Sequence, residues 1–192
     1  MISEEFRSRA LALVQPERRE HVEGTARTAE HLAKRWGADV CSAVTAALLH
    51  DCTKHIKGAE QLKLCERYGI IITQDDRESP GVLHAMSGAE FALREFGVAR
   101  EVADAIRTHT TGAPEMTMLQ RIIYLADLIE PTRSFRGIDE IRSLADTDML
   151  EAMIAATAHT VIYLCEGRRA VHTATVSTYN ALLRERARRA GK

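Results

Sequence analysis

The side chains in this chain that can bind a metal ion recur in the order H…HD…H…H…D. They are His21, the adjacent pair His50-Asp51, His84, His109 and Asp127. Imidazole and carboxylate are the groups that hold first-row transition metals, and four histidines with two aspartates suit two ions better than one. If these residues converge in space, they form a two-metal hydrolytic centre.

The adjacent pair His50-Asp51 is the centre of this hypothesis. Val44, Ala47 and Leu48 lie at helical spacing, which predicts a helix that ends at or near the pair. A carboxylate placed there can bridge two ions with its two oxygens. The histidines must be neutral to bind, so metal affinity should fall as the pH drops through the imidazole range. An HD dipeptide alone occurs by chance in many proteins. The hypothesis of a metal site therefore depends on the other four residues.

Asp127 is the second strongest indication of a metal. It lies within the almost wholly apolar stretch 122–129, where an unpaired carboxylate is costly to bury unless a metal or a cation faces it. The alternative is an aspartate that faces solvent or pairs with a nearby arginine. His21, His84 and His109 fall at predicted helix ends, and each taken alone is more often a surface or core histidine than a ligand.

Helical periodicity supplies the elements that must position these residues, and the four prolines mark the breaks between them. Helices are predicted at about 17–36, 40–50, 59–68, 83–96, 100–108, 117–130, 148–166 and 175–188. The only strand-like stretch is 70–72, which is too short to seed a sheet. The sequence therefore predicts an all-α protein.

The amino-acid composition limits the classes of protein to which this chain can belong. The 192 residues are 45% apolar and 28% charged, which is typical of one soluble globular domain, and only 5% are aromatic, so Ala, Leu, Ile and Val must build the core. Basic and acidic residues nearly cancel at 26 against 27, which argues against nonspecific nucleic-acid binding. The four cysteines show no CxxC spacing, and neither a signal peptide nor a membrane-spanning run is apparent. We expect a cytoplasmic protein with reduced thiols.

Basic residues gather in the last nine positions of the chain. They are Arg184, Arg186, Arg188, Arg189 and Lys192. A solvated helix end is the simpler interpretation of this run, and a polyanion-binding tail is the alternative.

The sequence around the ligand candidates resembles that of the HD-domain phosphohydrolases, and within them that of the bacterial YqeK proteins. The resemblance is carried by ALLHDCTK at 47–54, LHA at 83–85, IRTHTTG at 106–112 and IYLADLIEPTR at 123–133, and it extends from about His21 to Asn180. Cys52 and Thr53 depart from the pattern, where an aromatic and a small residue are expected. Neither is a ligand position.

The resemblance implies a fold, an activity and a metal. The fold is a single HD-domain helical bundle over residues 1–192, with a metal-binding core at about 17–131 and C-terminal helices at about 137–188. The activity is hydrolysis of diadenosine tetraphosphate into two ADP, through attack by a metal-bound hydroxide at a dinuclear centre. Two divalent ions are implied, with iron first and Mn, Co or Zn as alternatives. By matching position, the six residues of the series become the ligands and Asp51 the bridge.

Further residues are candidates for contact with the polyphosphate or the nucleotide. Lys54 lies one turn beyond the HD pair and is assigned, with Asp51, to the catalytic machinery, while Arg133 just beyond the Asp127 helix could touch phosphate. Thr110 follows His109, and the resemblance adds Arg169 and His172 in the loop before the last helix. For Lys54 and Arg133 a solvated surface position is the alternative, and Arg169 could instead cap a helix.

Two rival functions stay open. HD domains hydrolyse many phosphate esters, so another nucleotide could be the substrate. A nucleotide-sensing module without turnover is disfavoured because all six ligand candidates are present. The expected partners are a dinucleoside polyphosphate substrate and its ADP product, without a membrane or nucleic acid. A homodimer, the native metal and the preferred dinucleotide are left open.

Overall fold

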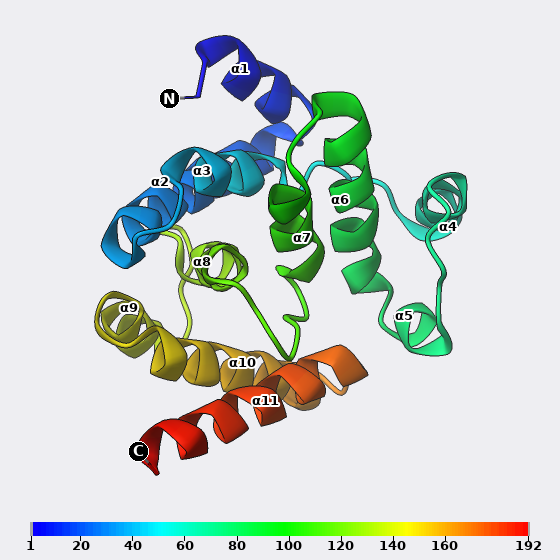
Figure 1. Cartoon of the computed structure of the whole chain (residues 1–192). Helices are drawn as coiled ribbons and strands as arrows, with labels where there is room; N and C mark the ends of the chain where they lie inside the picture. The colour runs from blue at the N-terminus through cyan, green and yellow to red at the C-terminus, as the bar shows by residue number, and fades with distance from the viewer. Residues whose placement is uncertain (1, 192) are drawn as a thin grey trace.

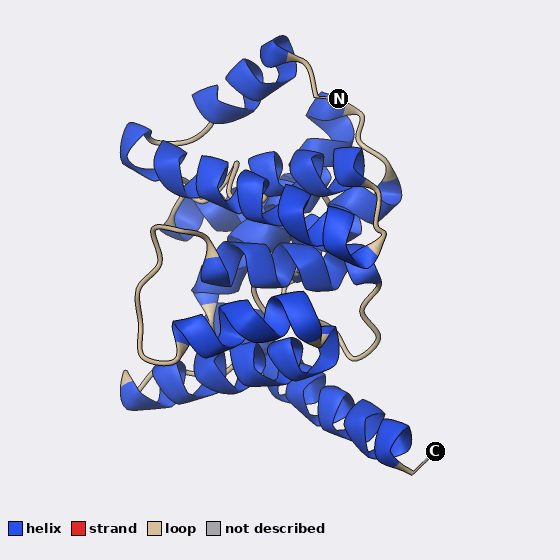
Figure 2. Cartoon of the chain, turned by 90° about the vertical axis from the view of Figure 1, so that its left-hand side faces the viewer, coloured by secondary structure: helices blue, strands red, loops and turns tan. Residues whose placement is uncertain are grey.

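The computed structural model describes residues 2–191, which form helices and no strand (Figures 1 and 2). The α-helices are α1 (Glu4–Ala12), α2 (Arg19–Trp36), α3 (Val40–Leu49), α4 (Gly58–Arg67), α5 (Gln74–Glu78), α6 (Leu83–Phe96), α7 (Arg100–Thr108), α8 (Met118–Ile129), α9 (Ile138–Thr147), α10 (Met149–Glu166) and α11 (Thr173–Ala190), with short 3-10 helices η1 (Pro16–Arg18) and η2 (Pro80–Val82). The all-α prediction is confirmed. Lys192, counted above in the basic tail, and Met1 lie outside the described residues.

The eight helices predicted from periodicity are present, with ends within about two residues of the expected positions. The prediction missed α1, α5 and α9. Helix α1 buries only Ala10, and α5 has five residues started by a capping box at Thr73, so neither carries the apolar stripe that periodicity detects. The stretch 70–72 is irregular, and Ile71 is 86% exposed.

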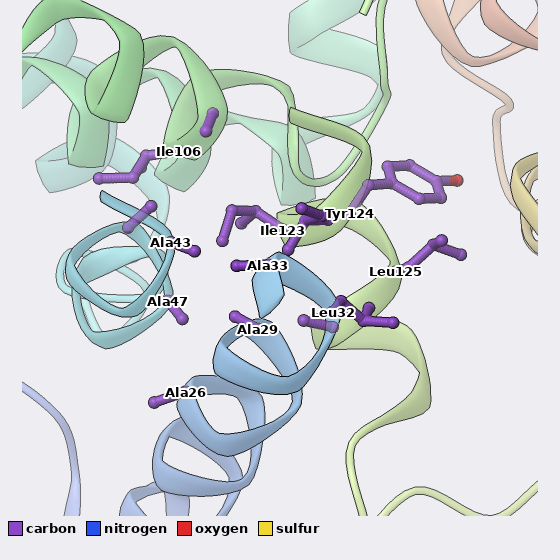
Figure 3. Packing of buried hydrophobic residues seen from close by; sticks show 14 of the residues in the cluster. Ala26, Ala29, Leu32, Ala33, Ala43, Ala47, Ile106, Ile123, Tyr124 and Leu125 are labelled. Atoms are coloured by element: carbon purple, nitrogen blue, oxygen red, sulfur yellow. The ribbon is translucent and has the colours of Figure 1, made fainter. Parts of the chain in front are cut away.

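Helices α2, α3, α7 and α8 pack together, α6 packs against α7, and these five helices position the residues of the HD pattern (Figure 1). Alanines of α2 and α3 face each other, with Ile123 of α8 beside them (Figure 3). Small side chains let helix backbones approach closely, and the buried set is mostly Ala, Leu, Ile and Val, as the low aromatic content predicted. This close packing fixes where the helix ends lie relative to one another.

The C-terminal helices form one side of the molecule, where α10 packs against α8, α9 and α11 (Figure 1). The arginines near the end of α11 are exposed, and two of them pair with the acidic start of α10. Arg189 lies 2.9 Å from Asp148, and Arg186 lies 3.6 Å from Glu151. These pairs agree with the simpler interpretation of the basic run as a solvated helix end.

Within residues 2–191, no helix has both the length and the apolar character needed to cross a bilayer. The four cysteines are all free, and Cys52 and Cys65 are buried.

Candidate metal centre

The six ligand candidates come from five helices and meet in one buried region. His21 lies in the first turn of α2, His50-Asp51 at the end of α3, His84 in the first turn of α6, His109 at the end of α7 and Asp127 within α8. The side chains of His50, Asp51 and His109 are fully enclosed, and that of Asp127 is 16% exposed. The structure therefore brings together all six residues that the sequence spacing singled out.

Three of the histidines have their ring orientation set by a nearby backbone carbonyl. His50 Nδ1 donates to Ala47 O at 2.7 Å, and His84 and His109 donate in the same way to the carbonyls of residues 81 and 106, at 2.6 and 2.7 Å. A carbonyl oxygen can only accept, so the proton sits on Nδ1 in each neutral ring. The lone pair of Nε2 is then free to bind a metal.

His21 is oriented by a carboxylate instead. Its Nδ1 donates to Glu130 Oε1 at 3.0 Å, and Glu130 is fully buried and also accepts from the Thr132 backbone at 2.7 Å. Burial alone would raise the pKa of Glu130, but the Thr132 and His21 contacts outweigh it and lower the pKa. Glycine at position 24 makes room for this carboxylate, because a Cβ there would lie 2.6 Å from Glu130 Oε2. A carboxylate on a histidine that binds metal fixes its tautomer and strengthens its basicity.

The two oxygens of Asp51 face different histidine pairs. Oδ2 lies 3.3 Å from His50 Nε2 and 3.7 Å from His21 Nε2. Oδ1 lies 3.2 Å from His84 Nε2 and 3.8 Å from His109 Nε2. Among the described residues, the buried Oδ1 accepts no hydrogen bond, although Lys54 Nζ lies 3.1 Å away outside hydrogen-bonding geometry. This is the arrangement expected of a carboxylate that bridges two cations.

The donor atoms divide into two groups around this carboxylate. Asp127 Oδ1 lies 3.1 Å from His21 Nε2 and 3.7 Å from His50 Nε2, so these three residues share one side with Asp51 Oδ2. On the other side, His84 Nε2 lies 3.1 Å from His109 Nε2. Since both of these atoms carry lone pairs when the rings are neutral, a cation between them satisfies both. The donor set fits divalent metal ions.

The pKa values within the cluster separate the histidines. Burial lowers the pKa of His109 to about 3 and also lowers that of His84, so both rings are neutral at pH 7. Burial would lower the pKa of His50 too, but the carboxylates of Asp51 and Asp127 outweigh it and raise the pKa to about 10. The pKa values of these two aspartates fall well below the usual range, because their contacts with the histidines outweigh the effect of burial. A metal must therefore displace a proton from His50.

Three cationic side chains surround the centre. The Arg18 guanidinium donates to Asp51 Oδ2, the Lys54 ammonium lies 3.1 Å from Asp51 Oδ1, and Arg133 donates to Asp127 Oδ1 at 3.0 Å. The sequence predicted Lys54 and Arg133 at the site but not Arg18. Glu130 was not predicted either. The available signals were a cation three positions before His21 and a carboxylate three positions after Asp127, each about one helical turn from a ligand candidate.

The other predicted nucleotide contacts are placed differently. Thr110 follows His109, and its buried hydroxyl has no hydrogen-bond partner within residues 2–191. Arg169 is exposed and lies over the Tyr163 ring, 4.2 Å from its centroid. His172 lies 3.1 Å from Asp76 Oδ1 and caps the start of α11. In the described part of the chain, no hydrogen bond or ion pair joins Arg169 or His172 to the six ligand candidates.

Two pockets open beside the ligand cluster. One, of about 440 Å³, includes His84 and Lys54 in its lining and extends to α4 and α5. The other, of about 360 Å³, includes His109 and Asp127 and extends to α10. A larger hollow of about 770 Å³ lies between Trp36, at the end of α2, and the start of α10. None of the six ligand candidates lines it. We therefore associate the two smaller pockets with the metal centre.

Comparison with known proteins gives a consistent result. The sequence model of the HD domain family matches residues 18–132. The symmetrical bis(5'-nucleosyl)-tetraphosphatase of Bacillus subtilis (strain 168) is 40% identical over 182 residues, which is 92% of this chain and 97% of that protein. The protein of the same name from Halalkalibacterium halodurans is 39% identical over 186 residues, covering 93% of this chain and 98% of the relative.

A solved structure has the same fold. The crystal structure of a predicted HD superfamily hydrolase involved in NAD metabolism from Clostridium acetobutylicum superposes with a TM-score of 0.91. It is 32% identical in sequence, and the match covers 96% of this chain and 99% of that one.

Proposed function

The chain belongs to the HD domain family, and from that premise we propose that it is a metal-dependent hydrolase that cleaves dinucleoside tetraphosphates symmetrically. The observation that carries the proposal is the Asp51 carboxylate, which turns one oxygen toward His21 and His50 and the other toward His84 and His109. The relatives with 40% and 39% identity, which are matched over nearly their whole length, are named for this activity.

We propose that the six residues hold two divalent ions with Asp51 as the bridge. One ion would take His21, His50 and Asp127, and the other would take His84 and His109. Nitrogen and carboxylate donors accept Fe, Mn, Co and Zn, and among these we propose iron as the native metal. Bound divalent ions make water a nucleophile at neutral pH and offset the negative charge of a polyphosphate.

The chain's own groups have separate parts in this reaction. Glu130 and three backbone carbonyls hold the Nδ1 protons and so leave Nε2 as the nitrogen that each ring directs to the ligand cluster. Arg18, Lys54 and Arg133 add positive charge where the phosphates must lie, and we assign Lys54 to the charge that develops during phosphoryl transfer. The enclosure of the ligand side chains limits solvent and strengthens these electrostatic interactions.

The proposed substrate is diadenosine tetraphosphate and the proposed product is ADP. Water adds to one of the two central phosphorus atoms, the oxygen between them leaves with the other half, and both halves become ADP. Thr110 and Arg133, which line the pocket at His109, are our candidates for contact with one half. Arg169 and His172 stay predictions, and so do the cytoplasmic location and the division into a metal-binding core and C-terminal helices.

A metal count combined with product chromatography tests the proposal. Gently purified protein should hold two metal ions per chain and convert diadenosine tetraphosphate to ADP as essentially the only product. AMP and ATP as main products would contradict symmetrical cleavage. Faster turnover of another nucleotide would favour the first rival function, and dinucleotide binding without cleavage would favour the sensing module.

The bridge itself is tested by Asp51→Ala. This change should lower the metal content and reduce kcat by about a thousandfold or more, because the metal supplies several kcal/mol of transition-state stabilisation. The helical circular-dichroism signal should persist. Asp139→Ala is the matched control, since Asp139 is 93% exposed on α9. Full metal content in Asp51→Ala, or global unfolding, would assign Asp51 a structural role instead.

A further inference from the structure

The two pockets beside the metal centre have separate walls. We call the pocket that reaches α4 and α5 the basic pocket, because Lys54, Lys57 and Arg77 line it. We call the pocket that reaches α10 the aromatic pocket, after its ring-bearing residues Tyr124, Phe135, His159 and Tyr163. No residue lines both. Figure 1 shows α4 and α5 beside α6, on the side away from α8, and Asp76 of α5 also contacts His172 just beyond α10.

The aromatic pocket presents a row of nearly parallel rings. Phe135 stacks on His159 with ring centroids 3.9 Å apart and planes at 19°. His159 and Tyr163 follow at 6.3 Å and 10°, because they lie four positions apart on one face of α10. Burial lowers the pKa of His159, which keeps its ring neutral at pH 7. Tyr163 is 55% exposed at the rim, where the Arg169 guanidinium lies over its ring, 4.2 Å from the centroid.

Polar groups lie between this row and the metal centre. Thr110 contributes a buried hydroxyl that has no partner within residues 2–191, and Arg133 contributes a guanidinium beside Asp127. A ring surface, a hydroxyl and a guanidinium next to a metal site match the base, the ribose and the phosphate of a nucleotide. Aromatic side chains stack on any base, so the row of rings could bind the base of a nucleotide.

The basic pocket carries its own unpaired polar atom. Gln61 is only 4% exposed, and its Oε1 has no hydrogen-bond partner in the described part of the chain. Its Nε2 donates to Ser87 Oγ at 2.5 Å, which holds the amide in place. Three cations and the apolar side chains of Leu62 and Leu83 complete the lining, so this pocket also suits a nucleoside with attached phosphates.

We infer that each pocket holds one nucleoside end of the substrate, and that Phe135, His159 and Tyr163 stack the base of one end. This inference rests on the proposed function and deepens it. A symmetrical cut requires an equal nucleoside diphosphate on each side of the broken bond. A metal centre between two nucleoside pockets places the middle of the polyphosphate at the ligand cluster.

The test compares neighbouring residues of α10 that differ in contact with the pocket. Tyr163→Ala should raise the KM for diadenosine tetraphosphate about tenfold while kcat and metal content change little, because stacking acts on substrate binding. Ile162→Ala is the matched control, since Ile162 is 56% exposed and does not line the pocket. His159→Ala should behave like Tyr163→Ala, and His159→Phe, which keeps a ring, should restore the KM.

ADP binding measured by calorimetry on the metal-loaded protein gives a second readout. The wild type should bind two ADP per chain, and a Phe135→Ala/His159→Ala variant with wild-type helical content should bind one. A single ADP in the wild type, or an unchanged KM in both Tyr163→Ala and His159→Ala, would overturn the inference.

The two proposals fail in distinguishable ways. If the wild type does not produce ADP from diadenosine tetraphosphate, the proposed function fails, and the ADP stoichiometry still decides on the pockets. If the wild type cleaves symmetrically while the ring variants keep its KM, only the inference about the pockets fails.

Discussion

The histidines of the metal centre each have one nitrogen committed to an acceptor and one directed to the ligand cluster. For His50, His84 and His109 the acceptor is the carbonyl three residues earlier, so the local chain supplies it. For His21 the acceptor is Glu130, which lies 109 residues away in sequence. This difference makes His21 the histidine whose orientation depends most on tertiary structure.

Replacement of Glu130 tests that dependence. Glu130→Gln keeps the size of the side chain but removes the charge that supports His21, and we expect metal affinity or turnover to fall about 10- to 100-fold. Competition with a chelator measures the affinity, and initial rates measure the turnover. The control is Glu140→Gln, because Glu140 is exposed on α9. Wild-type affinity in Glu130→Gln would mean that the carboxylate only fills space.

The raised pKa of His50 predicts the pH dependence of metal binding. A group with a pKa of about 10 is protonated at neutral pH, and the metal binds only the deprotonated ring. Binding therefore releases a proton, and the apparent affinity should rise about tenfold for each pH unit between about 6.5 and 8.5. Chelator competition at three pH values measures the slope. An affinity that does not change with pH would show that His50 is already neutral.

At the scale of the helices, the ligand candidates lie in a terminal turn or directly beyond one, and Asp127 lies two residues before the end of α8. The last turn of a helix leaves carbonyls without partners, and His50 and His109 use those carbonyls to orient their rings. Asp127 lies within α8, where it faces His21 and Arg133 rather than solvent. The Arg133 pairing is the alternative to a metal that the sequence left open, so the role of Asp127 as a metal ligand stays a prediction.

The contact between α2 and the end of α8 can be tested at Gly24. In Gly24→Ala the new Cβ would lie 2.6 Å from Glu130 Oε2 and 3.3 Å from Pro131 Cδ. We expect a loss of about 1–2 kcal/mol in the free energy of unfolding, since overpacking outweighs the better helix propensity of alanine. Urea denaturation measures it. Gly88→Ala is the control, because its nearest contact would be an ordinary 3.5 Å, and equal stability of the two variants would refute the steric argument.

At the scale of the whole molecule, the metal centre joins segments from both halves of the chain. Helices α2, α3, α6, α7 and α8 each supply at least one ligand candidate, or end just before one, so an ion bound there connects them. The matched family region ends at residue 132, yet α10 forms a wall of the aromatic pocket. Helix α10 therefore lines a pocket beside the ligand cluster although it supplies no ligand candidate.

Removal of the metal should consequently lower the stability of the fold without unfolding the protein. At a metal concentration one hundred times the Kd, binding at one site stabilises the folded state by about 2.7 kcal/mol. For a chain of this size the Tm should fall by about 5–11 °C after chelation, and turnover should be lost. Calorimetry and circular dichroism before chelation, after it and after metal is restored make the comparison. An unchanged Tm together with full turnover would contradict a metal-dependent centre.

The sequence alone determined the helices and the chemical types at the site. The spacing of apolar residues is a local property, so it located eight helices and placed every ligand candidate except Asp127 at or near a helix end. It did not predict α1 or α5, which are held by caps rather than by an apolar stripe, and it could not show which candidates share an ion.

Only the tertiary structure decided that grouping. The angle and offset between helices depend on close packing, and the packing of α2 against α8 joins segments that are far apart in sequence. That packing placed Asp51 between two histidine pairs, brought Glu130 to His21 and Arg18 to Asp51, and formed two separate pockets. Periodicity along one chain carries no information about these distances, because it describes each helix by itself.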